Sequence, residues 1–150
     1  MSVTALWPTP VHTGLLSEDD LTRLTPDPAL LAGLLPEHHR ARDLAWSSRI
    51  ETWDEGFHAA LRHGTGEWFA LVVLGARVRE RSGSEASGAL VLHDPRAGAA
   101  NVALPGLPWG RPITVPTITG TLVLVPGWLA WQIAPVHADE QRTVLTANTP

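Results

Sequence analysis

The chain has 150 residues, the length of one domain with a single hydrophobic core. It contains no cysteine, which excludes disulfides, thiolate metal sites and cysteine nucleophiles. A net charge of −4 without a basic stripe argues against a nucleic-acid-binding protein, because affinity for nucleic acid depends on neutralising phosphates. The chain has seven tryptophans, a residue type found in cores, ligand pockets and interfaces because it combines a large apolar area with one donor.

The hydropathy along the chain gives no indication of a membrane span. No run approaches the roughly 18 apolar residues that a spanning helix needs. The first ten residues, MSVTALWPTP, lack the basic and apolar regions of a secretion signal. We therefore expect a soluble, cytoplasmic protein.

The first part of the chain predicts an extended arm and two helices. Residues 5–11 are interrupted by prolines, which suits an edge strand or an arm lying on a sheet. Ser17 and Asp20 have the spacing of a helix-capping box, so a helix is expected to begin there. A second helix is expected with Pro28 in its first position, closed by Pro36, and with leucines on one side, namely Leu30, Leu31, Leu34 and Leu35.

Two adjacent histidines, His38 and His39, lie in the polar stretch 37–49. Adjacent side chains point in different directions in a helix and to opposite faces in a strand, so the pair is a poor metal site. We interpret the pair as part of a solvated loop.

Residues 52–63 have the pattern of an amphipathic helix. Thr52 and Glu55 have capping-box spacing, and Gly64 is a typical residue for a helix end. The apolar residues of this stretch share one face at helical spacing, namely Trp53, Phe57, Ala60 and Leu61.

From residue 67 the pattern changes to that of β-strands. The apolar run WFALVVL and the alternating ARVRERS are separated from GALVLH by the Gly/Ser-rich residues 82–87, which predicts a β-hairpin. Asp94-Pro95-Arg96 then predicts a turn. The following Gly/Pro-rich segment up to Pro112 contains Trp109 and suits a lid or a contact surface.

The last third contains three β-prone runs, at residues 121–125, 128–134 and 142–147. Pro126-Gly127 separates the first two, and the polar residues 136–141 separate the second and third. We interpret them as consecutive antiparallel strands.

The order and spacing of these runs resemble the C-terminal half of the double-stranded β-helix in a small family of 2-oxoglutarate, Fe(II)-dependent oxygenases. The family pattern is G-x-L-(V/L)-L-F-P-S-W-L-x-H-x-V-x-P, followed by a short acidic loop and R-I-S-I-S-F-N. GALVLHDPR at 88–96 and ALWPTPV at 5–11 also resemble family segments. The matching positions in the last third are Gly120, Leu122, Pro126, Trp128, Leu129, Pro135, Arg142 and Asn148.

Pattern and resemblance together predict one mainly β domain over residues 1–150. Its core is expected to be a double-stranded β-helix, of the jelly-roll or cupin-like kind, in residues 65–150. Residues 1–64 are expected to supply the N-terminal arm and helices packed on it.

The resemblance implies an iron site that this sequence does not retain. Such enzymes hold iron with two histidines and a carboxylate. Trp131 stands where the family has its distal histidine, and an indole nitrogen carries a donor N–H with no lone pair for a metal. An ungapped extension places Leu61 and His63 on the first ligand pair, which leaves His63 as the remaining candidate. This extension requires a strand where the local pattern predicts a helix.

A displaced metal site is a second hypothesis. His137-x-Asp139 has the spacing of two facial ligands, and His93 is the nearest other histidine in the sequence. The alternative is that all three are solvated loop side chains.

Two arginines are candidates for an anion site. Arg142 stands where the resemblance places the arginine for the co-substrate, and its planar fork matches a carboxylate. The alternative is a structural pair with Asp139, Glu140 or Asp94. Arg96 is either a second ligand residue or part of the Asp94 turn.

We expect that the chain is not a functioning iron oxygenase and needs no cofactor, while leaving open whether it is another kind of enzyme. One hypothesis is an accessory protein of small-molecule biosynthesis that binds a catalytic subunit, or itself, through Trp68, Trp109, Trp128 and Trp131. The other is a metal-independent enzyme or small-molecule binder, with Arg142 holding a carboxylate and Trp131 packing on the substrate. An oxygenase with an unorthodox metal site is a third. No phosphate-binding loop, nucleophile elbow or H-E-x-x-H motif supports another chemistry.

Overall fold

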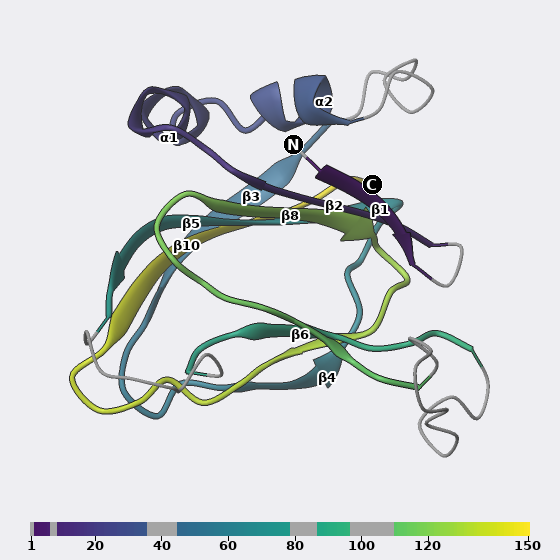
Figure 1. Cartoon of the computed structure of the whole chain (residues 1–150). Helices are drawn as coiled ribbons and strands as arrows, with labels where there is room; N and C mark the ends of the chain where they lie inside the picture. Colours follow the sequence, from purple (N-terminus) through teal and green to yellow (C-terminus); the bar gives the residue numbers. More distant parts are fainter. Residues whose placement is uncertain (1, 7–8, 36–44, 79–86, 97–109) are drawn as a thin grey trace.

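The computed structural model of the chain describes residues 2–6, 9–35, 45–78, 87–96 and 110–150. In this part of the chain, two antiparallel sheets face each other (Figure 1). The larger sheet has the order β1-β2-β8-β5-β10-β3, with β1 (Ser2–Leu6), β2 (Thr9–Leu15), β8 (Thr121–Pro126), β5 (Trp68–Arg77), β10 (Gln141–Asn148) and β3 (Ser47–Trp53). The smaller sheet has the order β4-β9-β6-β7, with β4 (Ala59–Arg62), β9 (Trp131–Ile133), β6 (Leu90–Leu92) and β7 (Ile113–Val115).

From β3 onward the chain crosses repeatedly between the two sheets. Strands β3, β5, β8 and β10 enter the larger sheet, while β4, β6, β7 and β9 enter the smaller one. As a result, strands that are distant in sequence become neighbours. Leu145 of β10, for example, is opposite Ile50 of β3 on one side and Val72 of β5 on the other. This winding is the double-stranded β-helix, so the predicted fold class is confirmed.

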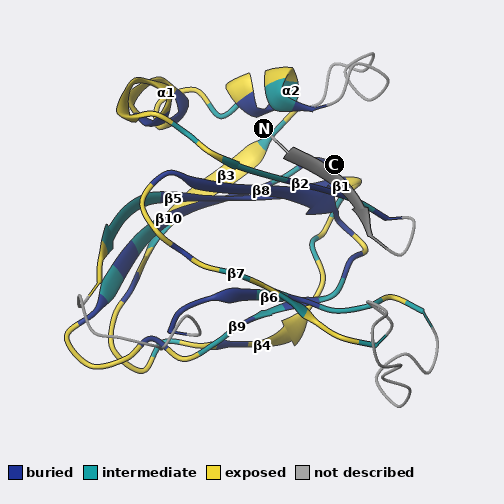
Figure 2. Cartoon of the chain, in the orientation of Figure 1, coloured by how far each residue is buried: buried dark blue, intermediate teal, exposed yellow. Residues whose placement is uncertain are grey.

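The central strands of the larger sheet are buried on both faces. One face packs against the smaller sheet, with Leu71, Val123 and Val144 in that core. The other face packs under the helices, where Val72, Leu124 and Leu145 meet leucines of both helices. A strand covered on both sides needs apolar residues at every position, which explains the unbroken runs in β5 and β8. Both strands are buried along most of their length (Figure 2).

The helices α1 (Glu18–Leu24) and α2 (Leu30–Leu34) cover the outer face of the larger sheet (Figure 1). The predicted cap of α1 is confirmed, because Ser17 Oγ accepts from the Asp20 N–H at 3.2 Å and Asp20 Oδ2 accepts from the Ser17 N–H at 3.3 Å. In α2, Leu31 is buried but Leu30 is exposed, so the predicted leucine face is only partly realised. None of the described helices is long and apolar enough to cross a membrane.

The prediction of a helix at residues 52–63 is wrong. The chain forms β3, turns at residues 54–56, where Gly56 has a φ of 78°, and then forms β4. Strand β3 pairs with β10 over its full length, from Arg142↔Trp53 to Asn148↔Ser47. These long-range pairs outweigh a local pattern that fits a helix equally well, since helix propensity is a weak preference.

The strand pairings predicted from sequence proximity are also wrong. Strands β5 and β6 lie in different sheets and do not form a hairpin. The last three strands exist as predicted, but β9 lies in the smaller sheet while β8 and β10 lie in the larger one. Alternation of apolar residues identifies a strand and its buried face without identifying its neighbour. The predicted turn residues 82–86 lie outside the described residues.

The predicted N-terminal arm forms part of the larger sheet. β1 is its edge strand and pairs with β2, with Ala5 opposite Pro10 and Leu6 opposite Thr9. Pro10 lies in β2 outside the part that pairs with β8, which begins at His12, so its missing N–H does not interrupt that pairing.

Candidate functional site

A cavity of about 340 Å³ lies against the edge strands β3 and β4, their respective neighbours β10 and β9, and Phe69 of β5. Its buried lining is mostly apolar and includes Trp53, Ala59, Phe69, Trp131 and Ile133. Its exposed lining is mostly polar and includes Ser47, Ser48, Arg49, Arg62, His63 and Thr65. The cavity therefore has an apolar floor and a polar rim, which is the usual composition of a small-molecule site.

Trp131 forms part of the cavity floor. It is 6% exposed and stacks on Phe69 of the opposite sheet, with ring centroids 4.7 Å apart and an interplanar angle of 11°. Its indole Nε1 is buried and has no hydrogen-bond acceptor among the described residues. The position at which the resemblance expects a metal ligand is thus filled by a stacked aromatic ring.

Arg62 is the register partner of Trp131 on the neighbouring strand β4. Its guanidinium carbon lies 5.3 Å from the centroid of the indole ring, within the range of a cation–π interaction. The pairing of β4 with β9 is irregular between Ala59 and Arg62, as in a β-bulge, and both of these residues line the cavity. Sequence reasoning missed Arg62, because a bulge leaves no signature in residue spacing.

The ungapped placement of Leu61 and His63 on the first ligand pair does not agree with this register. Leu61 is 57% exposed and is not part of the cavity lining. His63 does line the cavity, but its Nδ1 lies 2.7 Å from the Trp128 carbonyl oxygen. That nitrogen must carry a proton to donate there, so it is used in a backbone contact.

The first ligand pair of such enzymes is two residues apart in sequence. If Arg62 takes the first of these positions, Gly64 takes the second. A Cβ at Gly64 would lie 2.9 Å from Phe69 Cβ and 3.1 Å from both Asn148 Oδ1 and the Gly127 carbonyl oxygen. A carboxylate side chain cannot be added there without moving the sheet. The close packing around Gly64 therefore excludes a metal-binding side chain at this position.

The residues at this site do not fit an iron ion. The guanidinium of Arg62 is a cation that only donates hydrogen bonds, and Trp131 offers no lone pair. Within the described ranges, no group of three or more His, Asp or Glu residues could hold a metal. The displaced set of His93, His137 and Asp139 is therefore wrong. Asp139 adopts a positive φ of 62° in the turn before β10.

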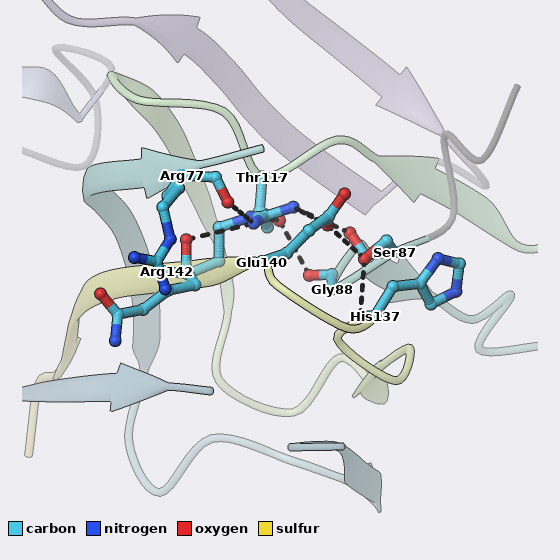
Figure 3. Close-up of polar contacts among 8 residues, drawn as sticks. Arg77, Ser87, Gly88, Thr117, His137, Glu140 and Arg142 are labelled. Carbon is cyan, nitrogen blue, oxygen red and sulfur yellow. Dashed lines mark hydrogen bonds and ion pairs between the residues drawn. The ribbon is translucent and has the colours of Figure 1, made fainter. Parts of the chain in front are cut away.

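Arg142 lies outside the cavity lining and is held by the protein itself (Figure 3). Its Nη2 pairs with Glu140 Oε2 at 3.0 Å and donates to the Ser87 carbonyl oxygen at 3.4 Å. Its Nη1 donates to the carbonyl oxygens of Arg77 and Gln141, and its Nε donates to Thr117 Oγ1. A guanidinium has five N–H groups, and all are used. The structural alternative, a pair with Glu140, is the one found, so no N–H remains for a ligand carboxylate.

The Arg142 pair belongs to a buried polar network that sequence reasoning missed. Ser87 Oγ donates to Glu140 Oε2 at 2.6 Å and accepts from the His137 N–H at 3.0 Å. Thr117 Oγ1 donates to the carbonyl oxygen of Gly88 at 2.9 Å. Figure 3 shows these residues converging around the start of β10. The network ties the segment before β6 and the loop before β10 to the larger sheet.

Arg96 forms an ion pair with Asp94, and the Asp94 side chain is 3% exposed. Asp94 also accepts from the backbone N–H of Arg96 at 3.1 Å and of Gly110 at 3.0 Å. The bonds from Arg96, opposed by burial and assisted by the two backbone N–H groups, lower the pKa of Asp94 to about 2. The predicted turn is confirmed, and Arg96 serves it as a structural partner of Asp94.

The tryptophans proposed for an interface occupy different environments. Trp68 is 3% exposed and lies in the core under the helices, and Trp131 lies in the cavity floor, so the prediction of an exposed surface is wrong for both. Trp128 is 54% exposed. Trp109 and the His38-His39 pair lie outside the described residues.

The sequence matches no protein-family model. It is similar to no curated protein. Solved structures do have the same fold. The epimerase SnoN from nogalamycin biosynthesis, described as non-heme and alpha-ketoglutarate-dependent, is similar with a TM-score of 0.54 and 16% identity, over 93% of this chain and 59% of that one.

Two further structures are similar to the chain. A prolyl 4-hydroxylase from Phytophthora capsici has a TM-score of 0.54 and 18% identity, over 93% of this chain and 47% of that one. A 2OG-Fe(II) oxygenase family oxidoreductase from Burkholderia pseudomallei has a TM-score of 0.51 and 14% identity, over 98% and 70% of the two chains. The chain therefore has the fold of 2-oxoglutarate, Fe(II)-dependent oxygenases, while spanning 59% of SnoN and 47% of the hydroxylase.

Proposed function

We propose that this chain is an oxygenase-like β-helix protein that has lost its iron site and binds a small organic molecule in the cavity between its sheets. The observation that carries the proposal is the Arg62–Trp131 pair. These two residues occupy the place where two metal ligands would be expected, and the cavity beside them remains open. A fixed cation and a ring without a lone pair disfavour a divalent ion and leave apolar surface for a ligand.

The loss of the iron site is tested by anaerobic titration calorimetry with Fe(II) in the presence of 2-oxoglutarate. We expect no binding heat, and no consumption of 2-oxoglutarate by the pure chain under air. Stoichiometric metal binding with turnover of 2-oxoglutarate would contradict the proposal.

Small-molecule binding is tested by tryptophan fluorescence and thermal shift with a panel of aromatic compounds. A ligand in the cavity contacts Trp53 and Trp131, so binding is expected to change the emission and to raise the melting temperature. Trp131→Phe, which keeps an apolar ring, is expected to retain binding with a smaller emission change. A panel with no effect on either signal would argue against a binding role.

A second candidate function is that of an accessory protein in small-molecule biosynthesis. It is supported by the exposed Trp128, whose carbonyl oxygen contacts His63 on the cavity rim. A large exposed aromatic beside a cavity mouth is a suitable anchor for a protein partner, such as a catalytic subunit. SnoN, from nogalamycin biosynthesis, is similar in fold.

Crosslinking and mass spectrometry in cells, with native chain and the Trp128→Ser variant in parallel, test this role. An interaction that depends on Trp128 and changes the rate of the partner enzyme would support it. Equal crosslinking by both chains would argue against this surface as the interface.

A further inference from the structure

The described cavity lining has a net positive formal charge, although the chain as a whole has a net charge of −4. The described lining contains two arginines, Arg49 and Arg62, and one glutamate, Glu51. Arg49 Nε pairs with Glu51 Oε1 at 3.0 Å and donates to Thr146 Oγ1 at 3.4 Å. Arg62 has no ion pair within the described part of the chain, so its charge is not compensated there.

The contact with Trp131 leaves Arg62 able to bind an anion. A guanidinium packed over an indole ring keeps the N–H groups at its edge available, in a planar fork that matches the two oxygens of a carboxylate. The cation–π contact also restricts the side chain, so less conformational freedom is lost on binding.

The remainder of the cavity favours a flat, apolar body. Trp53 and Phe57 stack on each other with centroids 5.0 Å apart and an interplanar angle of 7°, and both line the cavity. Phe69 and Trp131 form a second stacked pair in the same lining. A volume of about 340 Å³ is at the lower end for ligand pockets, which restricts the ligand to a small molecule.

We infer that the ligand is a small aromatic monocarboxylate, with its carboxylate on Arg62 and its ring on the aromatic floor. This inference rests on the proposed function, because it assigns the ligand class of the same cavity. Arg62 is solvent-exposed at the rim, so screening by water limits the electrostatic contribution. Apolar burial supplies most of the affinity, and Arg62 supplies the preference for an anion.

Calorimetric titration with three probes of similar shape tests the inference, namely phenylacetate, the neutral phenylacetamide and the cationic phenethylamine. Phenylacetate is expected to bind about tenfold more tightly than the amide, and the amine more weakly than both. Arg62→Gln is expected to abolish the tenfold preference, and Arg62→Lys, which keeps the charge but not the fork, to retain part of it. Arg23→Gln, an exposed arginine on α1, is the matched control and is expected to change nothing.

The outcomes separate this inference from the proposed function. Equal binding of phenylacetate and phenylacetamide would overturn the anion inference and leave the cavity as a binding site. Binding of phenylacetate that Arg62→Gln does not weaken would overturn the role of Arg62. No binding of any probe by the native chain would contradict both proposals. The comparison of probes on the native chain needs no variant, so it holds even if Arg62→Gln fails to fold.

Discussion

Arg62 and Trp131 lie opposite each other on two antiparallel strands, with the guanidinium carbon 5.3 Å from the centroid of the indole ring. Residues paired in this way have Cβ atoms about 4.5–5.5 Å apart. Two imidazoles at such paired positions could share a metal ion. In this chain the two positions hold a guanidinium cation and an aromatic ring instead. The two strands are paired as a metal site would require, but the two side chains repel or cannot bind a metal cation.

The pairing predicts which substitutions can create a metal site. The double variant Arg62→His/Trp131→His is expected to bind Ni(II), because it places two imidazoles at paired positions on the cavity side. Leu61→His/Trp131→His is the matched control and is expected not to bind, because Leu61 is not part of the cavity lining. Titration calorimetry measures both. Tighter Ni(II) binding by the Leu61 variant than by the Arg62 variant would show that the register is different.

Breaking the buried pair of Arg142 and Glu140 is expected to destabilise the fold. Arg142→Met removes the cation that pairs with the buried Glu140 carboxylate, which is expected to cost about 3–5 kcal/mol of unfolding free energy. The double variant Glu140→Leu/Arg142→Met is expected to recover a large part of this loss, because neither charge remains buried. Ser87→Ala, which removes one bond to Glu140, is expected to cost about 1–3 kcal/mol. Urea denaturation measures the unfolding free energy of the three variants. An Arg142→Met variant as stable as the native chain would contradict the described network.

The lowered pKa of Asp94 predicts a loss of stability in acid. Because the folded pKa of about 2 lies below the ordinary value of 3.8, the contribution of Asp94 is present above pH 3.8 and is lost as the pH falls toward 2. Between pH 5 and about pH 2 the native chain should therefore lose more unfolding free energy than Asp94→Asn, which has no carboxylate to protonate. Denaturant midpoints at several pH values measure this. Parallel pH profiles for the two proteins would show that Asp94 makes no such contribution.

Replacing Gly127 or Gly33 by alanine is expected to change the stability in opposite directions. A Cβ at Gly127 would lie 1.9 Å from the carbonyl oxygen of Gly66, so Gly127→Ala forces two backbone segments apart and is expected to be strongly destabilising. Gly33 lies inside α2 with no atom within 4 Å of an added Cβ. Gly33→Ala is therefore expected to stabilise by about 0.5–1 kcal/mol, the difference in helix preference. Thermal unfolding of both variants checks the contrast, and equal effects would contradict this packing.

Local signals in the sequence were sufficient for several elements. The Ser17 cap, the turn at Asp94 and the strands of the last third are determined by neighbouring residues, and the structure has them all. The same local reasoning failed at residues 52–63, where the apolar spacing fits a helix and two strands equally well. Only the partner strands β10 and β9 decide between them.

The residue identities by themselves determined that position 131 cannot bind a metal, because an indole has no lone pair to offer. Which residue faces Trp131 was decided by the tertiary structure, since the irregular pairing before Arg62 brings that arginine into the lining in place of Leu61. The fate of Arg142 was decided in the same way. The sequence left open whether Arg142 binds an anion or forms a structural pair, because its partners come from segments up to 65 residues away along the chain and meet it only when the two sheets close.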